Sequence, residues 1–277
     1  MSTHDTGGAD TLATRTGGPQ GTGEERAAPR TPRAVSLRLT LATAGRVLRQ
    51  IRHDPRTIAL LVVLPCVLLG LIAWMFDGTP VLDQFGPILV GLFPLVIMFL
   101  VTSVTTLRER QSGTLERLMT LPLGKGDFVG GYALAFALLA TVQALVVVAF
   151  AVWVCGMEVA GPVGLVVLVA VLDAILGSCL GLAASALARS EFQAVQLMPV
   201  ILFPQLITCG LLMPRDEMPA VLEAISRVLP LTYGVSALQD VAAGGTFADV
   251  SGAVAVIVAF IVGAIVLGTL TLRRRTA

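Results

Sequence analysis

The sequence predicts an all-α integral membrane protein with six transmembrane helices, and three observations lead to this class. Hydrophobic residues make up 55% of the 277 positions, charged residues only 13%, and the mean hydropathy is +0.86, whereas a soluble domain carries about 25% charged residues. Several apolar runs reach the roughly 18 residues that a helix needs to cross the ~30 Å hydrocarbon layer. The basic residues cluster in the segments between these runs.

Residues 1–33 are predicted to form a disordered cytoplasmic tail. They are rich in Gly, Thr, Ala, Pro and Arg and poor in large apolar side chains, so they cannot bury enough surface to fold alone. The tail also lacks the continuous apolar stretch of a signal peptide. The first transmembrane helix is therefore expected to direct membrane insertion.

A basic amphipathic helix is predicted over residues 34–54. Apolar residues recur at intervals of three or four: Leu37, Leu41, Ala44, Leu48 and Ile51. Arginines occupy its other faces. This pattern suits a helix that lies on the inner leaflet, or one that packs against a protein partner. Asp54-Pro55 ends the helix, because proline disfavours the helical conformation in the residue before it.

The apolar runs predict six membrane spans and place the membrane domain at residues 34–272. The spans are expected at residues 57–76, 88–106, 128–155, 163–188, 195–213 and 250–272. Pro199 and Pro204 should kink the fifth span, because each proline leaves a backbone carbonyl without its helical partner.

The orientation follows from the rule that Lys and Arg are retained in the cytoplasm. All but two of the 19 Lys and Arg residues fall on one side of the predicted spans; the exceptions are Arg215 and Arg227. With an even number of spans both termini share that side, including the basic end at residues 273–277. Because nearly all basic residues are Arg, a GC-rich bacterial genome is indicated. We therefore expect a multi-pass protein of a bacterial inner or plasma membrane, with cytoplasmic N- and C-termini.

The outer segment at residues 214–249 predicts a short helix at the outer membrane surface. Pro219 suits a first helical turn, and Glu223 precedes Arg227 by four residues, which makes a favourable exposed pair. Apolar residues recur here at helical spacing: Val221, Leu222, Ile225, Val228 and Leu229.

No hydrolytic, redox or metal-binding constellation is present in the sequence. The only histidines are His4 and His53, and the four cysteines form no CxxC pair. The Gly124-Lys125 pair lacks the upstream Gly and the following Ser or Thr of a P-loop. We expect that the chain is not an enzyme, binds no cofactor and contacts no nucleic acid. Because it lacks a P-loop, we expect that another subunit or an ion gradient supplies the energy for any transport.

The segment between the second and third spans predicts a short docking helix. Seven charged residues lie within residues 107–127. Helix-starting residues are followed by an apolar patch and then by a proline: Ser112, Gly113, Thr114, Leu115, Leu118, Met119 and Pro122. A short helix with an apolar stripe and flanking charges is typical of a docking site for a cytosolic partner, although a simple polar connector is the alternative.

Three stretches resemble the ABC-2 type permeases, which are membrane subunits like those of daunorubicin exporters. The run ERQSGTLERLMTLP at residues 109–122 resembles their ERxxGTLExLxxxP signature, and RHDPR at 52–56 resembles the RxDPR stretch before the first span. The outer segment is similar at residues 210–214, 218–219, 229–233 and 244–245. The similarity covers about residues 44–272.

The resemblance implies partners for the chain. It implies a second membrane subunit, often an identical one that would make a homodimer, and two copies of a cytosolic ABC ATPase that would bind ATP and magnesium. Residues 113–122 would form a coupling helix seated in a groove of the ATPase. The coupling residues would be Glu109, Gly113, Thr114, Leu115, Glu116, Leu118 and Pro122.

The resemblance also implies roles for two further segments. Residues 34–54 would form a connecting helix that also contacts the ATPase, with Arg46, Arg49, Arg52, Asp54 and Pro55 as its site residues. The helix around residues 218–229 would help to close the outer end of the pathway. The outer gate residues would be Pro214, Pro219, Pro230 and Tyr233.

Three polar residues within the spans are candidates for the translocation pathway. Asp173 lies in the middle of the fourth span, where a carboxylate is costly unless it is paired, hydrated or neutralised, so it should face the protein interior. It is either a pathway contact or a packing residue. Gln143 and Gln205 either line the pathway or bridge helices by hydrogen bonds. Gly177 and Gly181 have the GxxxG spacing that allows close helix packing.

The leading interpretation is the permease subunit of an ATP-driven ABC exporter for a hydrophobic or amphiphilic drug or antibiotic. A proton-coupled secondary transporter that uses Asp173 is one alternative, and an ABC-2 exporter of lipid or polysaccharide is another. A membrane enzyme acting on lipids is the least favoured, because the loops lack clustered catalytic residues.

Overall fold

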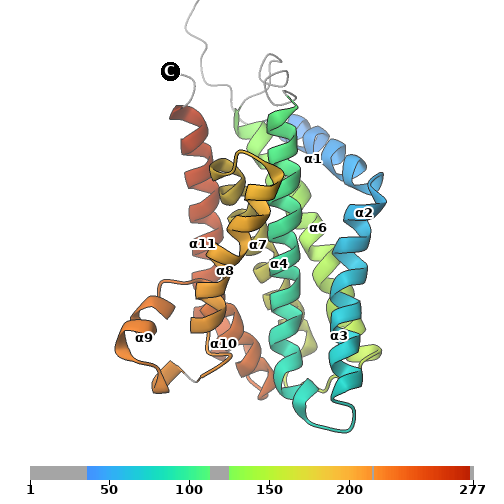
Figure 1. The fold of residues 1–277 in the computed structure, drawn as a ribbon, viewed down its shortest axis with the longest axis vertical. Helices are drawn as coiled ribbons and strands as arrows, with labels where there is room; N and C mark the ends of the chain where they lie inside the picture. The colour runs from blue at the N-terminus through green and yellow to red at the C-terminus, as the bar shows by residue number, and fades with distance from the viewer. Residues whose placement is uncertain (1–35, 113–124, 214, 275–277) are drawn as a thin grey trace, which may run out of the picture. The chain divides into compact units, whose positions relative to one another are not determined.

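The computed structural model describes residues 36–112, 125–213 and 215–274, and every regular element within them is a helix, which confirms the all-α class. Short helical turns at Ala59–Val63 (π) and Arg215–Glu217 (3-10) accompany the α-helices. The helices, arranged as Figure 1 shows, are α1 Leu37–Arg52, α2 Pro55–Ile58, α3 Leu64–Met75, α4 Val81–Gln111, α6 Lys125–Trp153, α7 Val163–Leu187, α8 Glu191–Thr208, α9 Ala220–Ser226, α10 Leu231–Ala242 and α11 Phe247–Arg274.

Five helices in the described part of the chain are long and apolar enough to cross a bilayer. They lie at Pro55–Met75, Val81–Gln111, Gly130–Trp153, Val163–Leu187 and Phe247–Leu267. The pair α9 and α10, bent by 89° at the intervening break, gives a sixth candidate. The chain therefore has the character of an integral membrane protein.

The helix α8 differs from the fifth predicted span. It begins at Glu191, ends at Thr208 and does not join those five candidates. Its glutamines, its acidic first residue and two internal prolines lower its apolar character. Conversely, the second half of the predicted outer segment folds into α10, which packs against α4, α7 and α11.

The helices α4 and α7 form the centre of the bundle through a backbone contact. A Cβ atom at Gly177 would collide with the carbonyl oxygen of Leu95, and one at Gly181 would collide with that of Phe99. The two glycines of the GxxxG pattern therefore allow α7 to lie directly on α4. A close backbone contact of this kind fixes the spacing of the bundle.

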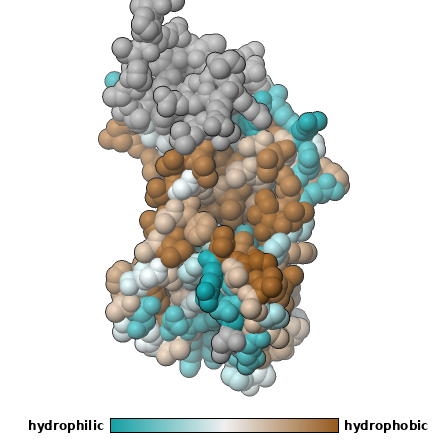
Figure 2. All heavy atoms as spheres, turned by 90° about the vertical axis from the view of Figure 1, so that its left-hand side faces the viewer, coloured by the Kyte–Doolittle hydropathy of each residue, from teal (hydrophilic) through white to brown (hydrophobic). Residues whose placement is uncertain are grey.

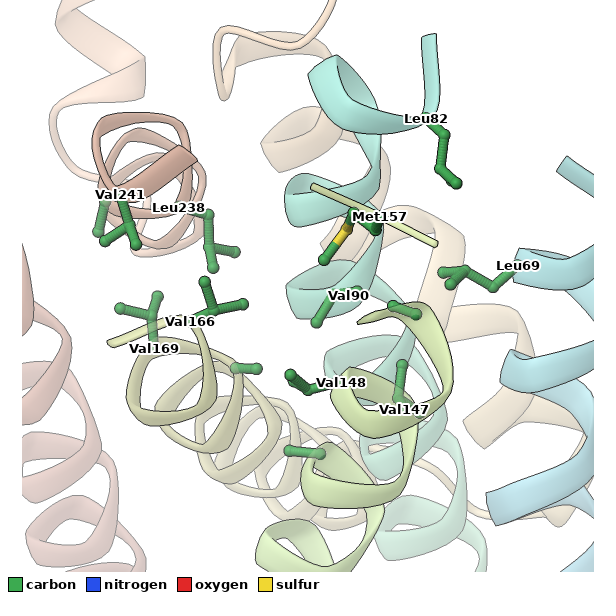
Figure 3. Close-up of a cluster of buried hydrophobic side chains, with 14 of the residues drawn as sticks. Leu69, Leu82, Val90, Val147, Val148, Met157, Val166, Val169, Leu238 and Val241 are labelled. Atoms are coloured by element: carbon green, nitrogen blue, oxygen red, sulfur yellow. The ribbon is translucent and has the colours of Figure 1, made fainter. Parts of the chain in front are cut away.

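Apolar side chains fill the space around this contact. Figure 3 shows one cluster, in which Leu69 of α3, Val90 of α4, Val148 of α6, Val169 of α7 and Leu238 of α10 point toward one another. The outer helices α3 and α11 bury little of their surface. Figure 2 shows a broad apolar band over the middle of one face of the bundle, as a lipid-facing surface requires.

The helix α1 lies across one end of the bundle, here called the α1 end, and α9 lies at the opposite one, called the α9 end (Figure 1). The buried face of α1 includes Ala44 and Ile51 of the predicted apolar stripe, but Leu37 and Leu41 of that stripe are 72% and 53% exposed. The buried residues are Thr40, Thr43, Ala44, Val47 and Ile51. Thr43 packs where a Cβ on Gly131 of α6 would lie, so only small residues fit at this crossing.

Candidate functional site

The candidate site begins where α4 ends, at the α1 end of the bundle. The predicted coupling residues Gly113, Thr114, Leu115, Glu116, Leu118 and Pro122 lie outside the described residues, as does Pro214 of the predicted outer gate. The structure does describe both stems of this segment. The last turn of α4 precedes it, and the first turns of α6 follow it.

Arg108 in the last turn of α4 holds the first residue of α8. Its Nε donates to Oε1 of Glu191 at 2.9 Å, and its Nη2 donates to Oε2 at 3.1 Å. This two-pronged geometry matches the planar guanidinium to the planar carboxylate. The hydrogen bond from Arg108 lowers the pKa of Glu191 from its ordinary value. Both side chains are exposed, so the pair contributes at most about 1 kcal/mol to stability.

Glu109 faces the interior of the bundle and pairs with α1. The side chain is only 6% exposed, and its Oε1 lies 3.8 Å from Nη2 of Arg46. The same Nη2 donates a hydrogen bond to the hydroxyl of Tyr132 in α6 at 2.8 Å. Arg46 therefore links α1 to both α4 and α6. This orientation leaves Glu109 little surface for a direct contact with a partner.

The next two residues of α4 hold the end of α7. Nη1 of Arg110 donates to the carbonyl oxygen of Ser185 at 2.6 Å. Nε2 of Gln111 donates to the carbonyl oxygen of Arg189 at 2.8 Å. Both acceptors are carbonyls in and just after the last turn of α7, where helical carbonyls lack intrahelical donors. The connection between α7 and α8 is thereby fixed to α4.

The other predicted residues of the connecting helix surround the turn between α1 and α2. Asp54 caps α2, because its carboxylate accepts from the backbone N–H of Arg56 at 3.1 Å and from the hydroxyl of Thr57 at 2.8 Å. The hydrogen bond from the Thr57 side chain lowers the pKa of Asp54. Pro55 occupies the first position of α2, where its missing N–H costs nothing. Arg49 and Arg52 remain exposed.

Asp173 lies in the middle of α7 and faces the interior, as its position in the sequence predicts. Its exposed fraction is 0%, and within the described residues neither carboxylate oxygen has a hydrogen-bond partner. A Cβ on Gly91 of α4 would lie 2.8 Å from Oδ2, and one on Gly234 of α10 would collide with the same carboxylate. Two glycines thus make room for this group between α4 and α10.

The two predicted glutamines differ in their contacts. Gln143 of α6 is fully buried, and neither atom of its amide finds a partner among the described residues. Gln205 of α8 bridges two helices, because its Oε1 accepts from the backbone N–H of Leu231 at 3.4 Å while its Nε2 donates to Ile201 at 3.1 Å. Gln205 thus connects α8 to the first residue of α10.

The α9 end carries the predicted surface helix. Glu223 and Arg227 form the predicted pair at 2.6 Å, and the hydroxyl of Tyr233 donates to the carbonyl oxygen of Arg227 at 2.7 Å. Pro219 precedes α9 and Pro230 precedes α10. A shallow apolar depression follows one face of α9, lined by Ala220, Val221, Ala224, Ile225, Val228 and Leu229. An exposed apolar face at this place suits contact with lipid.

Several residues of this arrangement were not found from the sequence. Glu191 is the first residue of α8 and Tyr132 lies in the first third of α6, and the partners of both lie more than 80 positions away in the sequence. The helix α10 could have been recognised from Leu231, Val235, Leu238 and Val241, which repeat at intervals of three or four. Among the described residues, no cluster of three His, Cys, Asp or Glu could hold a metal ion.

A comparison with known proteins identifies a family whose sequence model matches this chain. The family model described as "ABC-2 type transporter" matches residues 38–242. ABC transporter G family member 20 of Dictyostelium discoideum is 31% identical over 160 residues, which cover 58% of this chain and 22% of that protein. Probable multidrug ABC transporter permease YbhR of Escherichia coli is 28% identical over 147 residues, or 53% of this chain and 40% of the relative.

A third relative has a name that includes a compound. Linearmycin resistance permease protein LnrN of Bacillus subtilis is 25% identical over 158 residues, which cover 56% of this chain and 40% of that protein. The matched part of the chain thus spans between about a fifth and two fifths of the length of these curated relatives.

Proposed function

The chain belongs to the ABC-2 type transporter family, and on that premise we propose that it is the permease subunit of an ATP-driven exporter of a hydrophobic or amphiphilic drug or antibiotic. The names of two relatives, a multidrug permease and a linearmycin resistance permease, support this class of cargo. A lipid or a polysaccharide is the alternative cargo within the same family.

The observation that carries the proposal is the arrangement of the α1 end. The family-like run at residues 109–122 starts in the last turn of α4, and the amphipathic helix α1 is tied to both stems of that run through Arg46. A transport subunit that receives work from a cytosolic ATPase needs such a fixed platform around its docking segment, because a loose one would absorb the movement. The α1 end is therefore proposed to lie in the cytoplasm of a bacterial cell.

In this proposal the energy comes from two copies of an ABC ATPase, which bind ATP and magnesium. Closure of the ATPase pair displaces the coupling helix at residues 113–122, and the membrane helices move with it. A second copy of this chain completes the pathway, and the α9 end with Pro219, Pro230 and Tyr233 closes it on the outer side. Residues 1–33 act as a cytoplasmic tail and residues 34–272 as the transport domain.

A copurification experiment tests this function. The tagged chain, solubilised from its native cells, should retain an ABC ATPase identified by mass spectrometry. Leu115→Asp or Glu116→Arg should release the ATPase while the permease still elutes as a folded particle. Leu222→Asp and Glu217→Arg make the same changes at the α9 end and should leave the ATPase bound. A wild-type chain that retains no ABC ATPase, in a preparation that still transports, would refute the proposal.

Asp173 favours one second candidate function, a proton-coupled transporter. A fully buried carboxylate with no hydrogen-bond partner in the described residues has the character of a proton carrier. Proteoliposomes distinguish the two functions. Transport driven by an imposed proton gradient, without any ATPase and lost in Asp173→Asn, would select the second candidate, whereas transport that requires ATP and the ATPase would select the first.

A further inference from the structure

We propose that the last turn of α4, residues 108–111, is a hub that ties α1, α6, α7 and α8 together and distributes the movement of the following segment among them. This inference rests on the proposed function, since it concerns how work from an ATPase would enter the bundle. It assigns positioning roles to Arg46, Glu109 and Glu191.

The geometry of a helix explains why four consecutive residues can serve different neighbours. Successive side chains on an α-helix point about 100° apart, so four of them cover the whole circumference. Arg108 reaches Glu191 of α8, Glu109 reaches Arg46 of α1, and Arg110 and Gln111 reach carbonyls at the end of α7. The four residues of this turn thus contact three different helices or helix ends.

Arg46 adds a second connection that closes the hub. Its guanidinium contacts Glu109 before the docking segment and Tyr132 after it, so a single side chain of α1 joins both stems. Buried packing supports these polar contacts, because Val47 and Ile51 of α1 lie in one apolar cluster with Val101, Tyr132 and Phe136. The two stems and α1 are therefore expected to move as one body.

The connection to α8 extends the hub toward the α9 end. Beneath the Arg108–Glu191 pair, Leu107 of α4 packs with Ala188 and Ala194 at the turn between α7 and α8. At its other end, α8 contacts the start of α10 through Gln205 and the N–H of Leu231. Displacement of α4 at its last turn would therefore reach α10 through one intervening helix.

Charge reversal in pairs tests the hub in the complex of the full chain with its ATPase in proteoliposomes, with the fluorescent amphiphilic dye Hoechst 33342 as the transported probe. Arg108→Glu and Glu191→Arg each replace an attraction by a repulsion, and the double variant restores an ion pair with reversed polarity. We expect each single variant to lose about fivefold or more in ATP-driven transport, while the ATPase still copurifies and still hydrolyses ATP. The double variant should recover at least half of the wild-type transport.

The second pair, Arg46→Glu and Glu109→Arg, tests the connection between α1 and α4 in the same way. This pair is more buried than the Arg108–Glu191 pair, so its single variants can fail to fold. The exposed Arg108–Glu191 pair therefore decides whether the proposal stands. Asp77, an exposed residue in the turn between α3 and α4, is the control. Asp77→Arg reverses a charge outside the hub and outside the outer gate, and it should leave transport unchanged.

The possible results separate the two proposals. Single variants of Arg108 and Glu191 that transport at the wild-type rate with the ATPase bound would overturn the hub, and so would a double variant no better than the worse single one. Variants that release the ATPase would also overturn it, since these residues would then form the docking surface itself. A wild-type chain that binds no ABC ATPase would instead remove the proposed function on which the hub depends.

Discussion

Two buried carboxylates show how differently the two regions of this bundle are held together. Glu109 at the α1 end lies beside the guanidinium of Arg46, whereas Asp173 in the middle of the bundle lies between two glycines with no partner among the described residues. A paired acid fixes the helices that carry the pair, but an unpaired acid costs free energy and has to be tolerated by the fold. The α1 end is thus held by specific polar contacts, and the middle is held by close packing.

The largest expected effect concerns the packing of the middle region. Gly177→Leu would push α7 away from α4, because the new side chain would overlap the backbone of Leu95. We expect a loss of about 3 kcal/mol or more in the free energy of unfolding, or no folded protein at all. Thermal unfolding in detergent, followed by size-exclusion chromatography, measures it.

The matched control for this change is Gly263→Leu in α11, where a Cβ meets nothing within 4 Å. That variant should unfold near the wild-type temperature. Equal losses of stability in both variants would show that an added side chain is harmful at either place. That result would contradict a special role of the α4–α7 contact.

The next effect concerns the pair at the α1 end. Arg46→Ala leaves Glu109 buried without its cation and removes the bond to Tyr132, so we expect a loss of about 1–2 kcal/mol, less than for a fully buried pair because Arg46 is one-third exposed. Arg49→Ala on the same helix removes an exposed arginine and should change stability by less than about 0.5 kcal/mol. Chemical denaturation of the purified chain compares the two. Similar values would show that Glu109 does not depend on Arg46.

The comparison between the two acids becomes sharpest when the same change is made in each. Glu109→Gln removes one charge of an ion pair and should lower stability by up to about 1 kcal/mol. Asp173→Asn removes a charge that has no partner, so stability should stay level or rise. The difference in melting temperature between these two variants is the measurement. A loss in Asp173→Asn as large as that in Glu109→Gln would contradict the distinction.

The smallest effect is a pH dependence at the α1 end. The pKa of Glu191 in the folded chain is held below its ordinary value by Arg108, so the stabilisation is present above pH 4.5 and is lost as the pH falls through the folded pKa. The melting temperature of the wild type should therefore exceed that of Glu191→Gln slightly at pH 7, and the difference should shrink as the pH is lowered below 4.5. A difference that persists in acid would exclude the ion pair as its source.

Much of the fold could be predicted from the sequence because bilayer-spanning helices follow from hydropathy alone. The GxxxG contact of Gly177 and Gly181 and the pair of Glu223 and Arg227 also depend on local spacing. The apolar repeat at Leu231, Val235, Leu238 and Val241 predicts that α10 is a helix, but hydropathy does not show whether this helix lies in the bundle or at the outer surface. Its place in the bundle depends on contacts with distant helices.

The candidate site was predicted in part, because a motif gives positions but not side-chain directions. Glu109 belongs to the family-like run, yet the structure turns it toward α1. The predicted apolar stripe of α1 matches its buried face only in part: Ala44 and Ile51 are buried, but Leu37 and Leu41 are exposed, and the glycines of α6 accept the small residues Thr40 and Thr43. Such choices are made by tertiary packing and cannot be read from one helix alone.

Accessibility labelling tests the central claim, that the α1 end is the side on which an ATPase acts. In a chain with Cys66, Cys155, Cys179 and Cys209 replaced by Ala, a single cysteine is introduced at Glu116 or at Glu217. In intact cells a membrane-impermeant maleimide should label the Glu217→Cys variant at once and the Glu116→Cys variant only after the membrane is made permeable. Labelling of Glu116→Cys in intact cells would place the α1 end outside the cell and contradict the account.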